Sequence, residues 1–135
     1  MEIANQLALF LANKPGTLSN VCRVLSEAKI NIYAISTSDT IDHSVVRLIV
    51  DHPKRALQVF EDHGVLVVEN DVLMIDGDNK PGSLQKISQS LTDAGINIEY
   101  AYCATSPKSK RGLLILRPSN VPKALKILNT TKLKS

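Results

Sequence analysis

The sequence predicts an α+β protein made of two βαββαβ units in tandem, and three observations lead to this prediction. A segment of about twenty residues recurs 66 positions later in the chain. Apolar residues at helical spacing follow each copy of one Pro-Gly turn, and two strand-like runs follow each predicted helix. We name residues 1–69 the first repeat and residues 70–135 the second repeat, and expect each to form one domain.

The repeat is clearest around the Pro-Gly turn. Residues 13–18 read NKPGTL and residues 79–84 read NKPGSL, and the match continues to Ile30-Asn31-Ile32 and Ile96-Asn97-Ile98. Ten of the twenty positions from 13 to 32 are identical in the two copies. Farther along the match weakens, and we expect two extra residues in the second repeat around Asn120 to Pro122.

Each repeat divides into the same series of elements. The first strands are predicted at Gln6–Ala12 and Asp71–Asp76, as short apolar runs that end at a turn. A helix follows in each copy, with its apolar face at Leu18, Val21, Cys22, Leu25 and Ala28, and at Leu84, Ile87, Leu91 and Ala94. The remaining predicted elements are strands at Ile30–Thr37, Val45–Val50, Ile96–Ala104 and Leu113–Arg117, helices at Pro53–His63 and Asn120–Leu128, and closing strands at Val65–Val68 and Thr130–Leu133. This order is the ferredoxin-like one, an antiparallel sheet with its helices on one face.

Composition limits the function classes. The chain of 135 residues has a formal charge of +3 and 44% hydrophobic residues, which is ordinary for a globular protein and requires no nucleic-acid partner. Cys22 and Cys103 form no CxxC motif, so we expect two reduced, buried cysteines and neither a zinc site nor a disulfide. The apolar run 7–12 is too short for a signal peptide or a membrane span, and we expect a cytoplasmic protein without membrane contact. Units of this size are marginal alone, so we expect the repeats to associate and the chain to form a homodimer.

Catalysis and RNA binding are disfavoured. His43, His52 and His63 lie in or beside predicted loops without a triad-like context, and no nucleotide-binding or metalloprotease motif is present. His43 with Asp39 and Asp42 could form an acid–base or metal cluster, but a solvated loop is the simpler interpretation. An RRM domain shares the βαββαβ order, yet it stacks bases on aromatic residues that the predicted strands at 45–50 and 113–117 lack.

The Pro-Gly turns offer a binding function as well as a structural one. Pro and Gly are typical of a tight connection between a strand and a helix. The helix start also presents unpaired N–H groups and a positive dipole, which suit a carboxylate or a phosphate. Thr17 and Ser83 add a hydroxyl there, and Asn13 and Asn79 add an amide that can both donate and accept.

The spacing Asn-x-Pro-Gly-x-Leu, a helix of three turns and then Ile-Asn-Ile resembles the ACT domain, a small regulatory fold that senses amino acids. The resemblance covers the whole chain as two ACT copies and implies a stand-alone, non-catalytic protein without a cofactor. It also implies an amino-acid effector held between two paired units, with the first turn of one unit facing the second strand of the other. The residues implied to face each other are Asn13, Gly16 and Leu18 with Asn97 and Ile98, and Asn79, Gly82 and Leu84 with Asn31 and Ile32. Thr17 and Ser83, at the two helix starts, are further candidate ligand-binding residues, and Tyr100 or Tyr102 could line the pocket or simply cover the sheet.

The two copies differ at positions that bear on binding. Asp78 stands where the first repeat has Ala12, and Lys29 replaces Gly95, which we expect to alter how the chain enters the next strand. Tyr100 and Tyr102 replace Ala34 and Ser36. These features favour the second repeat as the one with more side chains suited to ligand binding. The rival interpretation is a dimerisation or docking module that regulates an enzyme or transporter without a ligand of its own.

Overall fold

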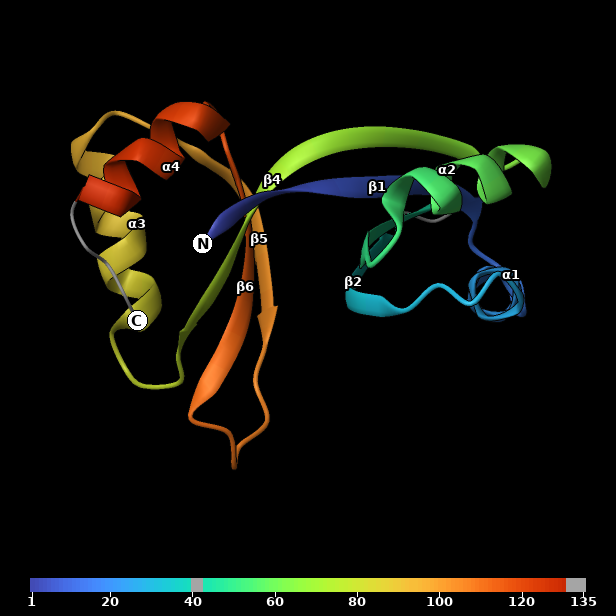
Figure 1. The fold of residues 1–135 in the computed structure, drawn as a ribbon, viewed down its shortest axis with the longest axis horizontal. Coiled ribbons are helices and arrows are strands. Elements are labelled where there is room, and N and C mark those ends of the chain that lie inside the picture. Colours follow the sequence, from blue (N-terminus) through green and yellow to red (C-terminus); the bar gives the residue numbers. More distant parts are fainter. Residues whose placement is uncertain (40–42, 131–135) are drawn as a thin grey trace. The chain divides into compact units, whose positions relative to one another are not determined.

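The computed structural model describes residues 1–39 and 43–130 of the chain, in ten helices and strands (Figure 1). In chain order these are β1 (Glu2–Ala12), α1 (Thr17–Glu27), β2 (Ile32–Asp39), β3 (His43–Val50), α2 (Pro53–Asp62), β4 (Leu66–Asp78), α3 (Ser83–Asp93), β5 (Ile98–Ala104), β6 (Arg111–Pro118) and α4 (Val121–Thr130). The chain divides into two compact units: an N-terminal unit, Asn5–Asn70, and a C-terminal unit, Met1–Ala4 with Asp71–Ser135. The α+β class and the twofold βαββαβ pattern are as predicted.

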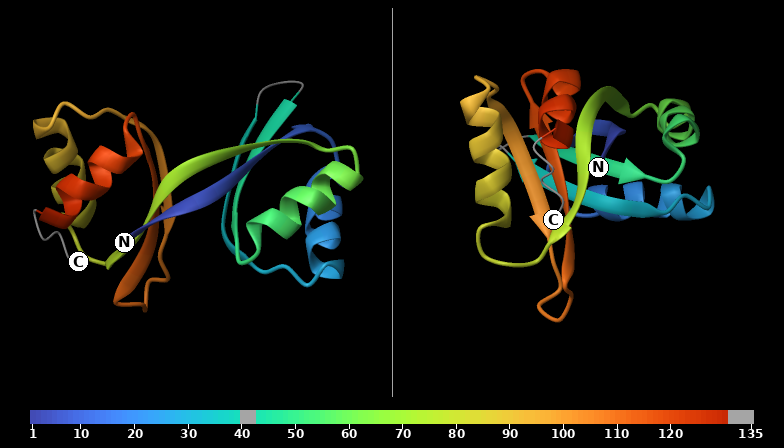
Figure 2. Two further views of the ribbon diagram at one scale, coloured as in Figure 1. Left: turned by 45° about the horizontal axis from the view of Figure 1, so that its top comes forward. Right: turned by 60° about the vertical axis from the view of Figure 1, so that its left-hand side comes forward.

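The N-terminal unit packs both of its helices against one face of its strands (Figure 2). The hydrogen-bonded order of all strands is β2-β3-β1-β4-β6-β5, of which β2, β3, β1 and the start of β4 belong to this unit. Leu7 of β1 lies opposite Leu48 of β3, and both side chains are fully buried. Residues two apart share a sheet face, so odd positions of β1 and even positions of β3 form the core with α1 and α2.

The C-terminal unit repeats this arrangement with β4, β6 and β5. Leu73 and Ile75 of β4 lie opposite Leu116 and Leu114 of β6, and these four side chains form the core together with Leu91 of α3. The helices α3 and α4 contact each other and lie on the same side of the strands (Figure 2).

The start of β1 takes the place that we had expected the C-terminal strand to fill. Residues Met1–Ala4 belong to the C-terminal unit, and β1 neighbours β4 in the sheet order. The expected strand Thr130–Leu133 is not seen, since Thr130 ends α4 and positions 131–133 lie outside the described residues. The predicted strands Val65–Val68 and Asp71–Asp76 also proved to be one continuous strand, β4. No Gly or Pro separates them, so nothing in the sequence ends the first.

The two extra residues of the second repeat lie in the loop between β5 and β6, and the expectation at Asn120 to Pro122 was wrong. Ser38 pairs with Val45 in the first repeat, and the equivalent Ala104 pairs with Leu113. The intervening positions are 39–44 in one case and 105–112 in the other. From β3 and β6 onward the repeats therefore correspond at an offset of 68, which equates Ala56 with Ala124; both alanines are fully buried.

The buried face of the first helix in each repeat differs from the predicted one, and in α1 it includes Val24, which was not predicted. Val21, Val24 and Leu25 of α1 are buried, whereas Leu18 is 43% exposed and the equivalent Leu84 is 48% exposed. Both leucines lie in the first helical turn, beyond the edge of the core. Both cysteines are exposed, contrary to expectation, because Cys22 lies outside the buried stripe of α1 and Cys103 lies on β5, which is an edge strand.

Lys29 and Gly95 lead the chain into the next strand in the same way, so the expected difference was wrong. Both residues have a left-handed backbone, with φ of 59° and 74°. In each case the following amide, of Ile30 or Ile96, donates to the carbonyl at the end of the helix at 2.9 Å. Lys29 adopts a conformation that residues other than glycine rarely occupy.

Candidate functional site

A hollow of about 260 Å³ opens at the turn between β1 and α1 of the N-terminal unit. Its volume is slightly below the roughly 300–1,000 Å³ of pockets for drug-sized ligands, which suits a small metabolite. The lining residues come from the end of β1, the turn, the start of α1 and the facing strands: Leu11, Ala12, Asn13, Lys14, Thr17, Leu18, Thr37, Ser44 and Val46. Of the residues predicted from the sequence, Asn13, Thr17 and Leu18 line this hollow together.

The backbone at this turn places the helix start beside the hollow. Gly16 has φ of 87°, which allows the chain to reverse tightly before α1 begins at Thr17. The first intrahelical bond runs from Asn20 N to Gly16 O at 2.9 Å. The first turn contains no acidic residue, so no carboxylate of the helix offsets the positive end of its dipole. With the Lys14 ammonium group nearby, the hollow has a positive character that favours a carboxylate.

The equivalent turn of the C-terminal unit has the same backbone and different side-chain contacts. Gly82 has φ of 91° before α3. The Asn79 Nδ2 group donates to Ser109 O at 2.7 Å and to Ser106 O at 3.4 Å, and the Asn79 backbone N–H donates to Lys110 O at 2.9 Å. The turn is thereby bound to the loop between β5 and β6.

The second predicted half of the site lies at Asn31 and Asn97. The backbone of Asn31 exchanges two bonds with Asp51, and that of Asn97 exchanges two bonds with Ser119. Both asparagine side chains are exposed. Asn31 and Ile32 line a shallow hollow of about 400 Å³ with residues of α1 and the α1–β2 connection, namely Cys22, Leu25, Ser26, Lys29 and Ile30.

The two predicted halves lie at opposite ends of one unit. Ala12, beside the turn, pairs with His43 at the start of β3, whereas Ile32 pairs with Val50 at its end. At about 3.4 Å per residue these ends are roughly 24 Å apart. In the C-terminal unit, Asp78 and Ile98 are separated along β6 in the same way. A single unit therefore brings Asn13 close to Thr17 but not to Asn31.

Tyr100 and Tyr102 share one face of β5, as predicted. They pair with Arg117 and Ile115 of β6, which lie on the face opposite the helices, and Ala34 and Ser36 take the equivalent places in β2. Tyr100 is thus on the other side of the sheet from the Ser83 side of the turn. Whether Tyr100 contacts an effector or only covers the sheet stays a prediction.

The sequence interpretation missed the polar residues Lys14, Thr37 and Ser44 of the hollow, as well as its apolar residues Leu11, Ala12 and Val46. Lys14 was part of the repeated motif and could have been selected as a cation next to a helix start. Thr37 and Ser44 belong to two other strands, and only their register places them beside the turn. Within residues 1–39 and 43–130, no cluster of three or more His, Cys, Asp or Glu side chains could hold a metal ion.

Comparison with known proteins identifies the family and the fold. The model of the ACT domain pair family matches residues 1–135. The crystal structure of protein BT0572 from Bacteroides thetaiotaomicron is similar with a TM-score of 0.90 and 34% identity, covering 96% of this chain and 89% of that one. The ligand-free regulatory subunit of aspartate kinase from Thermus thermophilus has a TM-score of 0.67 and 21% identity, covering 96% and 97% of the two chains. The corresponding subunit from Thermus flavus has a TM-score of 0.62 and 21% identity, covering 96% of each chain, and at this identity the likeness concerns the fold alone.

No curated protein proved similar to this chain. In the part of the chain that the structure describes, no helix has the length and apolar character needed to cross a membrane.

Proposed function

Because the chain belongs to the ACT domain pair family, we propose that it is a non-catalytic regulatory protein whose effector is a small amino acid bound at the turn between β1 and α1. The observation that carries this proposal is the hollow of about 260 Å³, which is formed by the same turn that defines the repeat. The residues that line it are suited to bind a zwitterion.

The chemistry of the hollow supports an amino acid. Its carboxylate would accept hydrogen bonds from the first amides of α1 and from the Thr17 hydroxyl, with Lys14 as the neighbouring positive charge. The Asn13 side-chain oxygen provides an acceptor for the ammonium group. Leu11, Leu18 and Val46 supply the apolar part of the lining. An effector with both charges at one end and a small side chain fits this set.

We further propose that the Asn31–Ile32 or Asn97–Ile98 segment completes the site. The turn and this segment lie at opposite ends of one unit, so a site that uses both must draw them from two different ACT units. A homodimer offers such a pair of units, and the exposed side chains of Asn31 and Asn97 support a role in binding.

A docking module that regulates an enzyme or transporter without its own effector is the second candidate. Leu18 and Leu84 occupy equivalent positions of the two repeats, and both side chains are exposed. Tyr33 and Ile35 of the edge strand β2 are exposed as well. Exposed large apolar side chains at an edge strand favour association with another chain. The proteins from Thermus that share the fold are named as regulatory subunits of an enzyme, which supports a role exerted on a separate partner.

Thermal melting of the purified chain with each of the twenty amino acids separates the two candidates. An amino acid at about 100 times its Kd adds about 2.7 kcal/mol to the free energy of unfolding and raises Tm by several degrees. We expect a shift with one amino acid or one chemical group of them. As controls, the matching carboxylic acid without an amino group and the matching amine without a carboxylate should give no shift. A panel without any shift would rule out the effector and leave the docking module.

A further inference from the structure

Resting on the proposed function, we infer that only the first repeat binds the effector, because in the second repeat the chain's own β5–β6 loop closes the equivalent site. The contacts of Asn79, Thr105 and Arg111 that hold this loop are called the latch. All of them lie within the C-terminal unit, and the open hollow lies entirely within the N-terminal unit.

The first component of the latch is Asn79. Its side-chain N–H groups donate to the carbonyls of Ser106 and Ser109, and its backbone N–H donates to Lys110 O at 2.9 Å. These three acceptors belong to the loop that is two residues longer than its counterpart in the first repeat. In this state the Asn79 amide nitrogen is engaged with the chain itself.

The second component is Thr105, which packs onto Gly112. The register equates Gly112 with Ser44, which lines the open hollow, since Gly77 pairs with Gly112 and Leu11 pairs with Ser44. A Cβ atom at Gly112 would collide with Thr105 Oγ1 and would lie 3.3 Å from its Cβ and Cγ2. Glycine at this position lets the Thr105 side chain pack directly onto β6 where this strand borders the turn.

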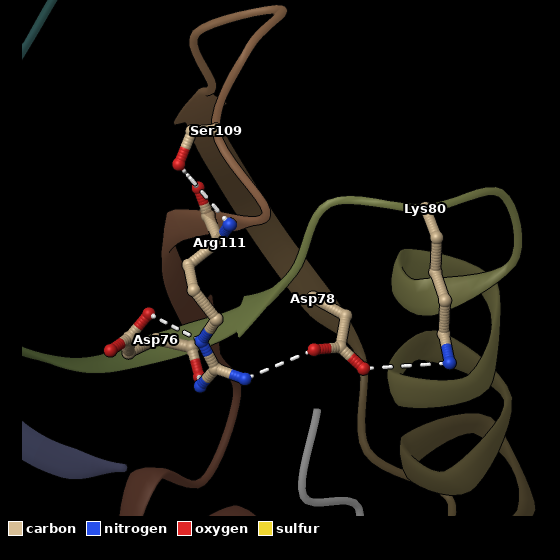
Figure 3. A network of polar contacts seen from close by, with 5 residues as sticks. All are labelled: Asp76, Asp78, Lys80, Ser109 and Arg111. Atoms are coloured by element: carbon tan, nitrogen blue, oxygen red, sulfur yellow. Dashed lines mark hydrogen bonds and ion pairs between the residues drawn. The ribbon is translucent and has the colours of Figure 1, made fainter.

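The third component is Arg111, which binds the strand that leads into the turn (Figure 3). Arg111 Nη1 lies 3.0 Å from Asp78 Oδ1, Nε lies 3.4 Å from Asp76 Oδ1, and Nη2 donates to Asp76 O at 2.8 Å. Ser109 Oγ donates to Arg111 O and accepts from Arg111 N, so the same arginine also orders the loop. Lys80 Nζ lies 3.4 Å from Asp78 Oδ2.

The two turns differ in the charged side chains that surround them. In the first repeat the equivalents of Asp76, Asp78 and Arg111 are Phe10, Ala12 and His43. Lys14 therefore follows an alanine at position 12, whereas Lys80 follows an aspartate at position 78. In the second repeat the lysine of the motif is already paired with Asp78. A ligand carboxylate therefore meets an available positive charge at the first turn and a neutralised one, next to a carboxylate, at the second.

The burial of the Ser83 hydroxyl also supports closure of the second site. Its oxygen is buried and has no hydrogen-bond partner among the described residues. The equivalent Thr17 lines the open hollow. Burial of a hydroxyl without a partner is unfavourable, so the Ser83 hydroxyl has lost the contact with solvent that a binding residue needs. The inference departs from the sequence-based hypothesis that favoured the second repeat.

Calorimetric titration of the full chain with each of the twenty amino acids, singly, tests the stoichiometry. We expect one equivalent per chain. Thr17→Val should weaken binding by about tenfold or more, because it removes one hydroxyl bond to a charged group without changing the shape. Ser83→Ala should leave the affinity within about twofold. Two equivalents per chain, or a loss of binding in Ser83→Ala with Thr17→Val unaffected, would overturn the inference.

Hydrogen exchange tests the latch itself without any ligand. Asn79→Ala should accelerate exchange of the amides from 105 to 110 by about tenfold, while amides of β6 from 113 to 117 should exchange as in the unmodified chain. Unchanged exchange across 105–110 overturns the latch, whatever binds. If the latch responds as expected and no amino acid binds, the proposed function fails and the closure stands.

Discussion

The turns after β1 and after β4 have nearly the same sequence, yet one borders an open hollow and the other is bound to a neighbouring loop. Both use a left-handed glycine, at φ of 87° and 91°, and both start an eleven-residue helix. On the inference drawn above, the difference comes from a loop two residues longer and from Arg111 in place of His43. The motif determines the backbone of the turn, and on that inference residues outside the motif determine whether a ligand has access to it.

The cores should respond equally to mutation, in contrast to the turns. Leu25 of α1 and Leu91 of α3 are equivalent and fully buried. Each replacement by alanine should lower the free energy of unfolding by about 2–5 kcal/mol, because it removes apolar contacts and leaves a cavity. Urea unfolding of the two variants measures this. As matched controls, Leu18→Ala and Leu84→Ala change leucines that are almost half exposed, and each should cost less than about 1 kcal/mol. A large difference between Leu25→Ala and Leu91→Ala would contradict the equivalence of the cores.

The backbone of the turns should also respond equally. Gly16 and Gly82 have positive φ, and a Cβ added at either would meet no atom within 4 Å. Gly→Ala at each position should therefore cost about 1–2 kcal/mol, from the left-handed backbone alone. Denaturant unfolding checks the two costs, with Ala28→Gly at the end of α1 as a control for the general effect of glycine. A cost at only one turn would mean that the latch, and not the residue conformation, determines the strain.

How well the sequence predicts each part of the structure depends on how far apart in the chain the interacting residues lie. Local patterns were sufficient for the helices, since Pro53 begins α2 and Gly82 precedes α3 as expected. They failed where the outcome depended on distant partners. Nothing local predicts that residues Met1–Ala4 join the C-terminal unit, because the pairing of β1 with β4 connects positions far apart in the chain.

The site shows the same limit. The Asn-Lys-Pro-Gly motif predicted the turn, and Asn13 and Thr17 do line a hollow. Ser44 and Thr37 could not be predicted, because their place depends on strand register. The latch could not be predicted, because the two extra residues were expected near Asn120 and lie instead in the loop between β5 and β6. Only this position of the insertion makes Arg111 the equivalent of His43.

Ser83 and Thr17 offer a smaller effect that sharpens the contrast between the turns. The Ser83 hydroxyl is buried without a partner, so Ser83→Ala should raise the free energy of unfolding by about 1 kcal/mol. The expected rise in Tm is a few degrees, measured by calorimetry. Thr17→Ala at the open turn should not stabilise the chain, since its side chain lines the hollow and stays partly exposed. A destabilised Ser83→Ala variant would show that the hydroxyl has a partner in solution.

The smallest expected effect concerns Lys29 and Gly95, an equivalent pair that shares a left-handed backbone although only one of the two residues is glycine. Lys29 has φ of 59°, which costs a non-glycine residue about 1–2 kcal/mol, and glycine would remove that strain. Glycine also loses more backbone entropy on folding, about 0.5–1 kcal/mol, which opposes the gain. The net result for Lys29→Gly should be a stabilisation of about 0.5 kcal/mol. Gly95→Lys should destabilise the second repeat by a similar amount. The bond from Arg55 to Lys29 O involves the backbone, so both variants keep it. Parallel urea unfolding of the two variants measures the signs, and equal signs would show that the two strand entries differ in solution.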